Sequence, residues 1–262
     1  MCVARTSVLE VPRLRLRRGL EVVGYGLYVE ELGSLLVADL HVGYEGALAE
    51  QGVFVPPLQA REMKEALAAM IGESGAERVI ILGDVKHEFG DVTRQEWRET
   101  IDLLEYLKRG LGVRVDVVRG NHDNYLVVVL KRLEIPFHDP YLLEGDWLFI
   151  HGHKPFPVEG FREDVRFVAM GHEHPALALR DSLGVKVKLK ALLEGSYTGK
   201  QVYVLPALSP LMPGTEVNVE RSFLSPLLRE TGVDEYKAYG VDLEAGIFDF
   251  GEVKYLRNVS EQ

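Results

Sequence analysis

Short hydrophobic runs alternate with polar clusters along the first two thirds of the chain. The runs are rich in β-branched residues and end at glycine or at polar residues, which is typical of buried strands. They cover residues 35–38, 79–82, 115–118, 148–150 and 167–170. Helical patterns lie between several of them. This alternation predicts a largely parallel sheet, in which ligands bind beyond the carboxyl ends of the strands.

Three segments have the periodicity of amphipathic helices. The first covers residues 57–73 and begins with a proline suited to a first helical turn. Its predicted apolar face is formed by Leu58, Met63, Leu67, Met70 and Ile71. In the second, Thr93 and Glu96 have the spacing of a capping box, and the face that follows carries Trp97, Ile101, Leu104 and Leu107. The third runs to Leu133, with Asp123 or Asn124 as its cap.

The pattern changes after residue 175. Strand-like segments at 185–190, 201–205 and 246–250 follow one another with few helices between them, which predicts a second sheet packed on the first. Residues 205–214 contain three prolines and form a loop that we place near the rim of a site; the alternative is a rigid connection without a catalytic part. Because no linker or low-complexity tract divides the chain, we expect a single domain over residues 1–262.

The charge balance excludes one way of binding phosphate. Lys and Arg number 30 and Asp and Glu number 40, so the formal net charge is −10. An acidic protein is not held to nucleic acid or anionic lipid by overall attraction, so any phosphate needs a local site. The single cysteine, Cys2, excludes an intramolecular disulfide and a multi-thiolate metal site. No segment has the apolar length of a signal peptide or a membrane helix, so we expect a cytoplasmic protein without membrane contacts.

A polar cluster follows each of the five hydrophobic runs. The clusters are Asp39-Leu40-His41, Gly83-Asp84 with His87, Gly120-Asn121-His122-Asp123, His151-Gly152-His153 and Gly171-His172-Glu173-His174. Gathered together, these carboxylates and imidazoles would carry a high desolvation and repulsion cost, which metal cations offset. A ligand set without thiolates suits Mn²⁺, Fe²⁺, Zn²⁺, Co²⁺ or Ni²⁺. Because the candidate ligands exceed those of one tetrahedral ion, we expect two ions that share a carboxylate.

In this order the clusters resemble the signature of the calcineurin-like metallophosphoesterase superfamily: D-x-H, G-D, G-N-H-D/E, a single His and G-H-x-H. The wording Ala-Asp-Leu-His-Val-Gly, Gly-Asp-Val-Lys-His, His-Gly-His-Lys-Pro and Gly-His-Glu-His-Pro is similar to the archaeal branch related to the DNA-ligase-associated phosphoesterases. The resemblance covers residues 35 to about 175. It implies an α/β fold, namely a four-layer αββα sandwich of two mixed sheets flanked by helices.

The resemblance also implies a role for each matched residue. One divalent transition-metal ion would be bound by Asp39, His41 and His174, the other by Asn121, His151 and His172, and Asp84 would bridge them. His122 would face the scissile phosphate and stabilise its charge or protonate the leaving oxygen. We expect Mn²⁺ first among the possible metals. A metal-bridging hydroxide would then serve as the nucleophile at neutral pH.

The motifs leave two roles open for each of three residues. Asp123 accepts a bond from the His122 ring, and so sets its tautomer and takes part in catalysis, or it caps the following helix. His87 is a polar loop residue, or it supports the metal ligands or contacts phosphate. His153 donates to the substrate or supports His151.

Other polar and aromatic residues can be interpreted as structural or as functional. His138 is expected in a turn. Tyr44 and Tyr125 stack on a base or sugar, or they pack within the protein. Two strands carry basic residues at every second position: Arg13, Arg15, Arg17 and Lys186, Lys188, Lys190. If these strands were neighbours they would form a basic strip for a nucleic-acid backbone; otherwise they solvate sheet edges.

The function expected from these features is metal-dependent phosphoester hydrolysis, most specifically by a phosphodiesterase acting on a nucleotide or a short nucleic acid. The preference for diesters comes from the branch that the chain resembles. The alternatives are a phosphomonoesterase and a non-catalytic binding scaffold of the same fold. The acidic surface argues against strong binding of long DNA.

Overall fold

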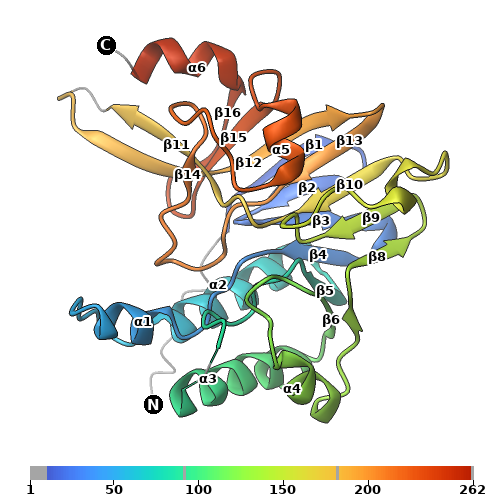
Figure 1. Cartoon of the computed structure of the whole chain (residues 1–262), viewed down its shortest axis with the longest axis vertical. Coiled ribbons are helices and arrows are strands. Elements are labelled where there is room, and N and C mark those ends of the chain that lie inside the picture. Colours follow the sequence, from blue (N-terminus) through green and yellow to red (C-terminus); the bar gives the residue numbers. More distant parts are fainter. Residues whose placement is uncertain (1–10, 91–92, 181–182, 261–262) are drawn as a thin grey trace, which may run out of the picture.

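The five hydrophobic runs lie in strands whose bounds agree with the expected ones to within one residue. The computed structural model describes residues 11–90, 93–180 and 183–260, and Cys2 lies outside them. Over these ranges, two mixed β-sheets pack face to face, and helices cover the outer face of each (Figure 1). The expected four-layer α/β sandwich is therefore confirmed.

In the part of the chain that is described, the first sheet has seven strands, which lie in chain order. They are β1 (Arg13–Arg17), β2 (Leu20–Val23), β3 (Gly26–Val29), β4 (Ser34–Val37), β5 (Arg78–Ile81), β6 (Arg114–Val118) and β7 (Phe137–His138). Strands β4 to β7 are parallel. Strands β1 to β4 are antiparallel because only a few residues connect them. The predicted parallel arrangement therefore applies to one half of this sheet.

Helices connect the parallel strands and cover the outer face of the first sheet. They are α1 (Tyr44–Glu50), α2 (Gln59–Ser74), α3 (Arg94–Glu105) and α4 (Leu126–Arg132), with a 3-10 turn η1 (Glu30–Leu32) and a π-helical turn η2 (Tyr106–Gly110). Helix α1 is not predicted by the sequence pattern. None of the helices described here is both long and apolar enough to cross a membrane.

The helix predictions hold in the interior of each helix and fail at some ends. The predicted face of α2 is buried at Met63, Leu67, Met70 and Ile71. Leu58 is 45% exposed, because it precedes the first helical turn and so does not share that face. Thr93 does cap α3, since its side chain accepts the backbone N–H of Glu96 at 3.1 Å.

The second sheet, counted over the described residues, has nine strands. They are β8 (Tyr141–Glu144), β9 (Trp147–Ile150), β10 (Phe167–Met170), β11 (Pro175–Arg180), β12 (Lys186–Tyr197), β13 (Lys200–Val204), β14 (Thr215–Glu216), β15 (Lys237–Asp242) and β16 (Gly246–Glu252). Its helical segments are η3 (Val158–Phe161), α5 (Pro226–Thr231) and α6 (Val253–Ser260). Strands β9, β10 and β13 are parallel. This confirms the predicted second sheet.

Alternation along the strands divides the apolar side chains among three hydrophobic layers. Val79 and Ile81 of β5 pack beneath α2, α3 and α4. Ile80, between them in sequence, points to the layer between the two sheets, where Phe149 of β9 meets it. Leu148 of β9 packs on the opposite face, with residues of α5 and the start of α6. Because successive side chains of a strand point to opposite faces, continuous apolar runs require this double burial.

His138 does not lie in a turn. It belongs to β7, and its Nε2 is 2.7 Å from Oδ1 of Asp116. Asp116 also accepts Nε of Arg78 at 2.7 Å, and both of these side chains are 9% exposed. Burial favours a raised pKa for Asp116, but the bonds from His138 and Arg78 hold that pKa below its ordinary value.

The two basic strands do not form a strip. β1 lies at the edge of the first sheet and β12 in the interior of the second. Arg13 and Arg15 pair with Glu21 on β2, whereas Lys186 and Lys188 pair with Glu216. These cations are thus already paired with carboxylates of their own sheets.

We predict that Asp116→Ala lowers the free energy of unfolding by about 3 kcal/mol, because it leaves the buried charge of Arg78 with Glu144 alone. Urea titration at pH 7 measures this loss. The matched control is Glu105→Ala, which removes an exposed pair with Arg109 and should cost less than about 0.5 kcal/mol. Since the pKa of Asp116 is lowered by folding, its contribution is present above about pH 4 and is lost as the pH falls below it. Equal losses in the two variants would contradict the prediction.

Candidate metal centre

The polar clusters meet where the carboxyl ends of strands from both sheets come together. Asp39 and His41 follow β4, Asp84 follows β5, and Asn121 follows β6; from the second sheet, His151 follows β9, and His172 and His174 follow β10. Main-chain hydrogen bonds join these loops. The N–H of Asp39 donates to the carbonyl of Gly83 at 3.1 Å, and the N–H of Gly171 donates to the carbonyl of His151 at 3.1 Å. The predicted convergence of the clusters is confirmed, but the five runs do not share one parallel sheet as expected, because β9 and β10 belong to the second sheet.

The backbone is left-handed at five of these positions, which is uncommon for residues other than glycine. The φ angles are 57° at Asp39, 44° at His41, 53° at Asp84, 70° at His172 and 50° at His174. Such conformations cost about 1–3 kcal/mol each and persist where the surroundings fix them. Two glycines allow close approach: a Cβ at Gly120 would lie 2.1 Å from Oδ1 of Asp84, and one at Gly171 would lie 2.7 Å from Oδ2 of Asp39. This explains why the motifs contain glycine.

One group of possible ligands comprises Asp39, His41 and His174. Nε2 of His174 is 3.2 Å from Oδ1 of Asp39 and 3.4 Å from Nε2 of His41. Asp39 is fully buried, and its Oδ1 has no hydrogen-bond donor among the described residues. Burial alone would raise the pKa of Asp39, but the His174 and His151 imidazoles lower it. Burial lowers the pKa of His41 to about 3, which leaves its ring neutral.

A second group comprises Asp84, His151 and His172, with Asn121 beside them. Nε2 of His151 faces Oδ2 of Asp84 at 3.2 Å and Oδ1 of Asn121 at 3.0 Å. Its Nδ1 lies 2.7 Å from the carbonyl of Leu82, which as an acceptor fixes the proton on Nδ1. Nε2, the atom that loses its proton when a metal binds, therefore converges with two oxygen acceptors, as in a set of metal ligands.

Asp84 lies between the two groups. Its Oδ2 is 3.7 Å from Nε2 of His41 and 3.2 Å from Nε2 of His151. The donor types, the buried and unpartnered oxygen of Asp39 and this shared carboxylate fit divalent cations. The structure thus brings all seven predicted ligands together, while their assignment to two ions stays a prediction.

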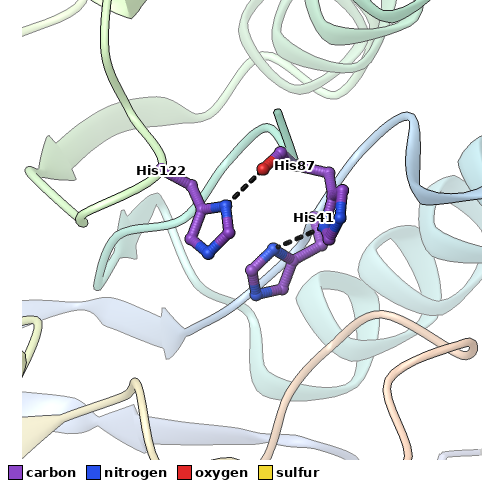
Figure 2. A group of neighbouring side chains, drawn as sticks. All are labelled: His41, His87 and His122. Carbon is purple, nitrogen blue, oxygen red and sulfur yellow. Dashed lines mark hydrogen bonds between the residues drawn. The ribbon is translucent and has the colours of Figure 1, made fainter. Parts of the chain in front are cut away.

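His122 and His87 line the same cluster on the side of His41 (Figure 2). Nδ1 of His122 is hydrogen-bonded to the main-chain carbonyl of His87, and Nδ1 of His87 is 3.4 Å from Nδ1 of His41. Burial lowers the pKa of His122, and burial together with His122 lowers the pKa of His87 to about 4. His87 is therefore not a solvated loop residue but a member of the site.

Neither predicted contact of Asp123 is present. Its carboxylate accepts the backbone N–H groups of Gly120, Asp84 and Val85 at 2.8, 2.9 and 2.8 Å. Tyr125 occupies the N-cap position of α4, where no side chain forms a capping hydrogen bond. Burial, with the charge of Asp84, raises the pKa of Asp123 to about 6. Asp123 acts as a clamp between the loops after β5 and β6, because these loops point unpaired N–H groups at one buried position.

Buried residues that the motif analysis missed hold the loops from outside. Glu96 of α3 accepts the N–H groups of His87 and Glu88 at 2.9 and 2.8 Å. Glu173, between the two histidines of its motif, accepts the N–H groups of Leu224 and Ser225 at 2.8 and 2.9 Å. The capping-box spacing and the motif itself mark these two positions, but their partners are distant in sequence.

The loop at residues 205–214 does lie against the site, as expected. The N–H of Ser209 donates to the carbonyl of Asp39 at 3.2 Å. Gln59 of α2 donates through Nε2 to Oγ of Ser209 at 2.7 Å and to the carbonyl of His41 at 2.9 Å. The buried amine of Lys190 donates to the carbonyl of Ala207 at 2.7 Å, and burial lowers its pKa to about 7. These contacts fix the position of the loop. A catalytic role for it stays a prediction.

The remaining candidates lie at the margin of the cluster. The His153 ring is 5.1 Å from that of His151, and burial lowers its pKa to about 4. The ring of Tyr44 packs on His87 at 4.4 Å, whereas Tyr125 is 66% exposed. Tyr44 therefore follows the packing interpretation, and Tyr125 remains accessible to a ligand.

Comparison with known proteins places this geometry in a family. The sequence profile of the calcineurin-like phosphoesterases matches residues 34–176, which is more than half of the chain. The chain belongs to the calcineurin-like phosphoesterase family. The matched segment contains the seven candidate ligands together with His122 and Asp123. Family membership and the site agree that the chain is a metal-dependent phosphoesterase, that is, a metal-binding hydrolase.

Two solved structures and one negative result complete the comparison. The nuclease MPE of Pseudomonas putida shares 23% sequence identity at a TM-score of 0.59, over 89% of this chain and 97% of that chain, which shows a common fold. YfcE, a phosphoesterase from E. coli, shares 17% identity at a TM-score of 0.39, over 80% of this chain and 87% of that chain. No curated protein matches the sequence of this calcineurin-like phosphoesterase.

We predict that Mn²⁺ binding at pH 7 releases about one proton from the protein. Burial lowers the pKa of His151, but the Asp84 carboxylate outweighs it and raises that pKa to about 9, and a ligand imidazole must be neutral. Affinity should therefore increase with pH up to about 9. Calorimetric titration in buffers of different ionisation enthalpy measures the proton. His41→Gln should keep the wild-type release, and His151→Gln should release about one proton fewer than the wild type, whatever metal-bound water adds to both; equal release in the wild type and His151→Gln contradicts the prediction.

Asp123→Ala should weaken Mn²⁺ binding by roughly 10- to 100-fold, because it leaves three buried N–H groups unpaired and frees the loop that carries Asp84. Titration calorimetry measures the affinity. Asp123→Asn, which keeps one carbonyl acceptor, should fall between the wild type and the alanine variant. Asp102→Ala, on the exposed face of α3, serves as the control. Wild-type affinity in Asp123→Ala would exclude the clamp.

Proposed function

We propose that this phosphoesterase is a two-metal phosphodiesterase that hydrolyses nucleotides or short nucleic acids. The observation that carries the proposal is the shared position of Asp84 between two groups of ligand side chains. Asp39, His41 and His174 would hold one ion and Asn121, His151 and His172 the other, with Mn²⁺ expected first. When bound, two such ions polarise phosphoryl oxygens and lower the pKa of a water molecule.

His122 is the proposed proton donor to the leaving oxygen. The carbonyl of His87 holds a proton on Nδ1 of the His122 ring, and Nε2 is turned toward Asp84, 3.9 Å from its Oδ2. In this tautomer Nε2 carries a proton only when the ring is cationic. A bound phosphodiester, which is negatively charged, stabilises that cation, so the second proton is available for transfer once substrate is in place.

Further observations support the preference for nucleotide diesters. The structural neighbour from Pseudomonas putida is described as a nuclease, and the motif wording is similar to the archaeal branch related to the DNA-ligase-associated phosphoesterases. The net charge of −10 favours short substrates that reach a local cationic centre over long DNA. A cytoplasmic location and a single domain remain part of this proposal, whereas Asp123 enters it only as the clamp of the loops that carry Asp84 and His122.

His122→Ala should reduce turnover of a simple aryl phosphodiester by roughly 100-fold or more, because the leaving oxygen loses its proton donor. Metal analysis of the same variant should still give about two ions per chain. His138→Gln removes a histidine on β7, outside the site, and should keep wild-type turnover. Equal turnover in His122→Ala would remove this residue from catalysis.

A substrate panel assayed with Mn²⁺ decides between the proposed activity and its alternatives. Phosphodiesters, phosphomonoesters, cyclic nucleotides and single-stranded oligonucleotides are compared by kcat/KM. The proposal expects the diesters and short oligonucleotides to be hydrolysed fastest. Faster hydrolysis of monoesters indicates a phosphomonoesterase, and bound metal without hydrolysis of any class indicates a binding scaffold.

A further inference from the structure

An exposed aromatic side chain lies directly on the proposed proton donor. The ring of Phe89 is centred 3.7 Å from the ring of His122, with an angle of 35° between the planes. Phe89 is nevertheless 52% exposed. A phenylalanine that served only as core packing would be withdrawn from water, so half of this aromatic surface is open beside the reacting position.

The main chain around Phe89 is held in place from three sides. The carbonyl of Phe89 accepts Nδ2 of Asn124 at 3.1 Å, which links it to the loop that carries His122. The preceding N–H groups, of His87 and Glu88, donate to Glu96. The carbonyl of His87 itself receives Nδ1 of His122 (Figure 2). The main chain that carries Phe89 is therefore tied to the loop of His122, and the Phe89 ring lies against the His122 ring.

Its chemistry fits one part of a nucleotide. Every nucleobase has a flat π-face, and proteins bind single-stranded nucleic acid by stacking bases on aromatic side chains. A phosphate has no such face and gains little from an exposed phenyl ring. The metal ligands and His122 would bind and cleave the phosphodiester, whereas Phe89 offers an apolar plane next to the proposed position of the leaving oxygen.

We propose that Phe89 is a base-stacking residue that binds the nucleobase on the leaving side of the scissile phosphodiester. The inference rests on the proposed function and deepens it, because it makes the leaving group a nucleoside or an oligonucleotide rather than any alcohol. Stacking of this kind contributes by alanine substitution roughly 5- to 100-fold in binding per base.

The experiment uses four dinucleotide phosphodiesters. Thymine is present on both sugars, on the 5′ sugar alone, on the 3′ sugar alone or on neither, and tetrahydrofuran replaces the missing base. KM and kcat are measured for each with the Mn²⁺-loaded full chain. In the wild type, the base on the leaving sugar, which is the sugar released without phosphate, should lower KM by roughly 5- to 100-fold. In Phe89→Ala that ratio should fall to about 1.

Three further variants separate stacking from packing. Phe89→Leu keeps an apolar contact with His122 but has no π-face, so it should lose the base-dependent ratio. Phe89→Trp should keep or increase it. Phe248→Ala removes another partly exposed phenylalanine, on β16 outside the site, and should leave the ratio at the wild-type value.

The outcomes separate this inference from the proposed function. If the wild type hydrolyses none of the four compounds, both fail. If it hydrolyses them without regard to the bases, if Phe89→Ala keeps the wild-type ratio, or if Phe89→Leu restores it, the stacking role is wrong and the phosphodiesterase proposal stands. A ratio that is lost in Tyr125→Ala and kept in Phe89→Ala would assign the base to Tyr125 and overturn the role of Phe89.

Discussion

The buried carboxylate of Asp84 is the constraint on which the arrangement of this protein depends. Asp84 lies in the loop after β5 of the first sheet. Its carboxylate lies near two imidazoles, that of His41 from the first sheet and that of His151 from the second. A carboxylate removed from water requires neighbours that stabilise its charge. Because these neighbours come from both sheets, the packing of the apolar layer between the sheets sets the distances within the site. The geometry of the site therefore depends on how the two sheets pack.

The loops around Asp84 are fixed chiefly through the main chain. Several ligands sit in left-handed conformations that the chain avoids when it is free. The contacts that offset this cost include the bonds from three backbone N–H groups to Asp123, those from two to Glu96 and those from two to Glu173. Buried carboxylates are suited to this task because an ionised group accepts several strong hydrogen bonds at once. The protein therefore uses acidic residues both as candidate ligands and as clamps.

Charge is distributed unevenly over the molecule. The chain is acidic overall. On β1 and β12, Glu21 pairs with Arg13 and Arg15, Glu216 pairs with Lys186 and Lys188, and backbone carbonyls accept Lys190. The proposed source of attraction for phosphate is therefore a small centre whose Asp and His side chains fit divalent cations. Neutral imidazoles and the exposed ring of Phe89 border that centre, so it offers charge to a phosphate and an apolar surface to the group attached to it.

The sequence by itself determined the strands that precede the motifs, the interiors of α2 and α3 and the set of residues that gather at the site, because each motif follows a hydrophobic run at the carboxyl end of a strand. It did not reveal that β3 is the antiparallel partner of β4, that His87 joins the cluster or that His138 pairs with Asp116. Nor did it show what Asp123 binds. Tertiary structure decided these points because the partners are backbone N–H and carbonyl groups or side chains from distant loops. Such groups are present in every residue, or are distant along the chain, and so leave no local pattern in the sequence.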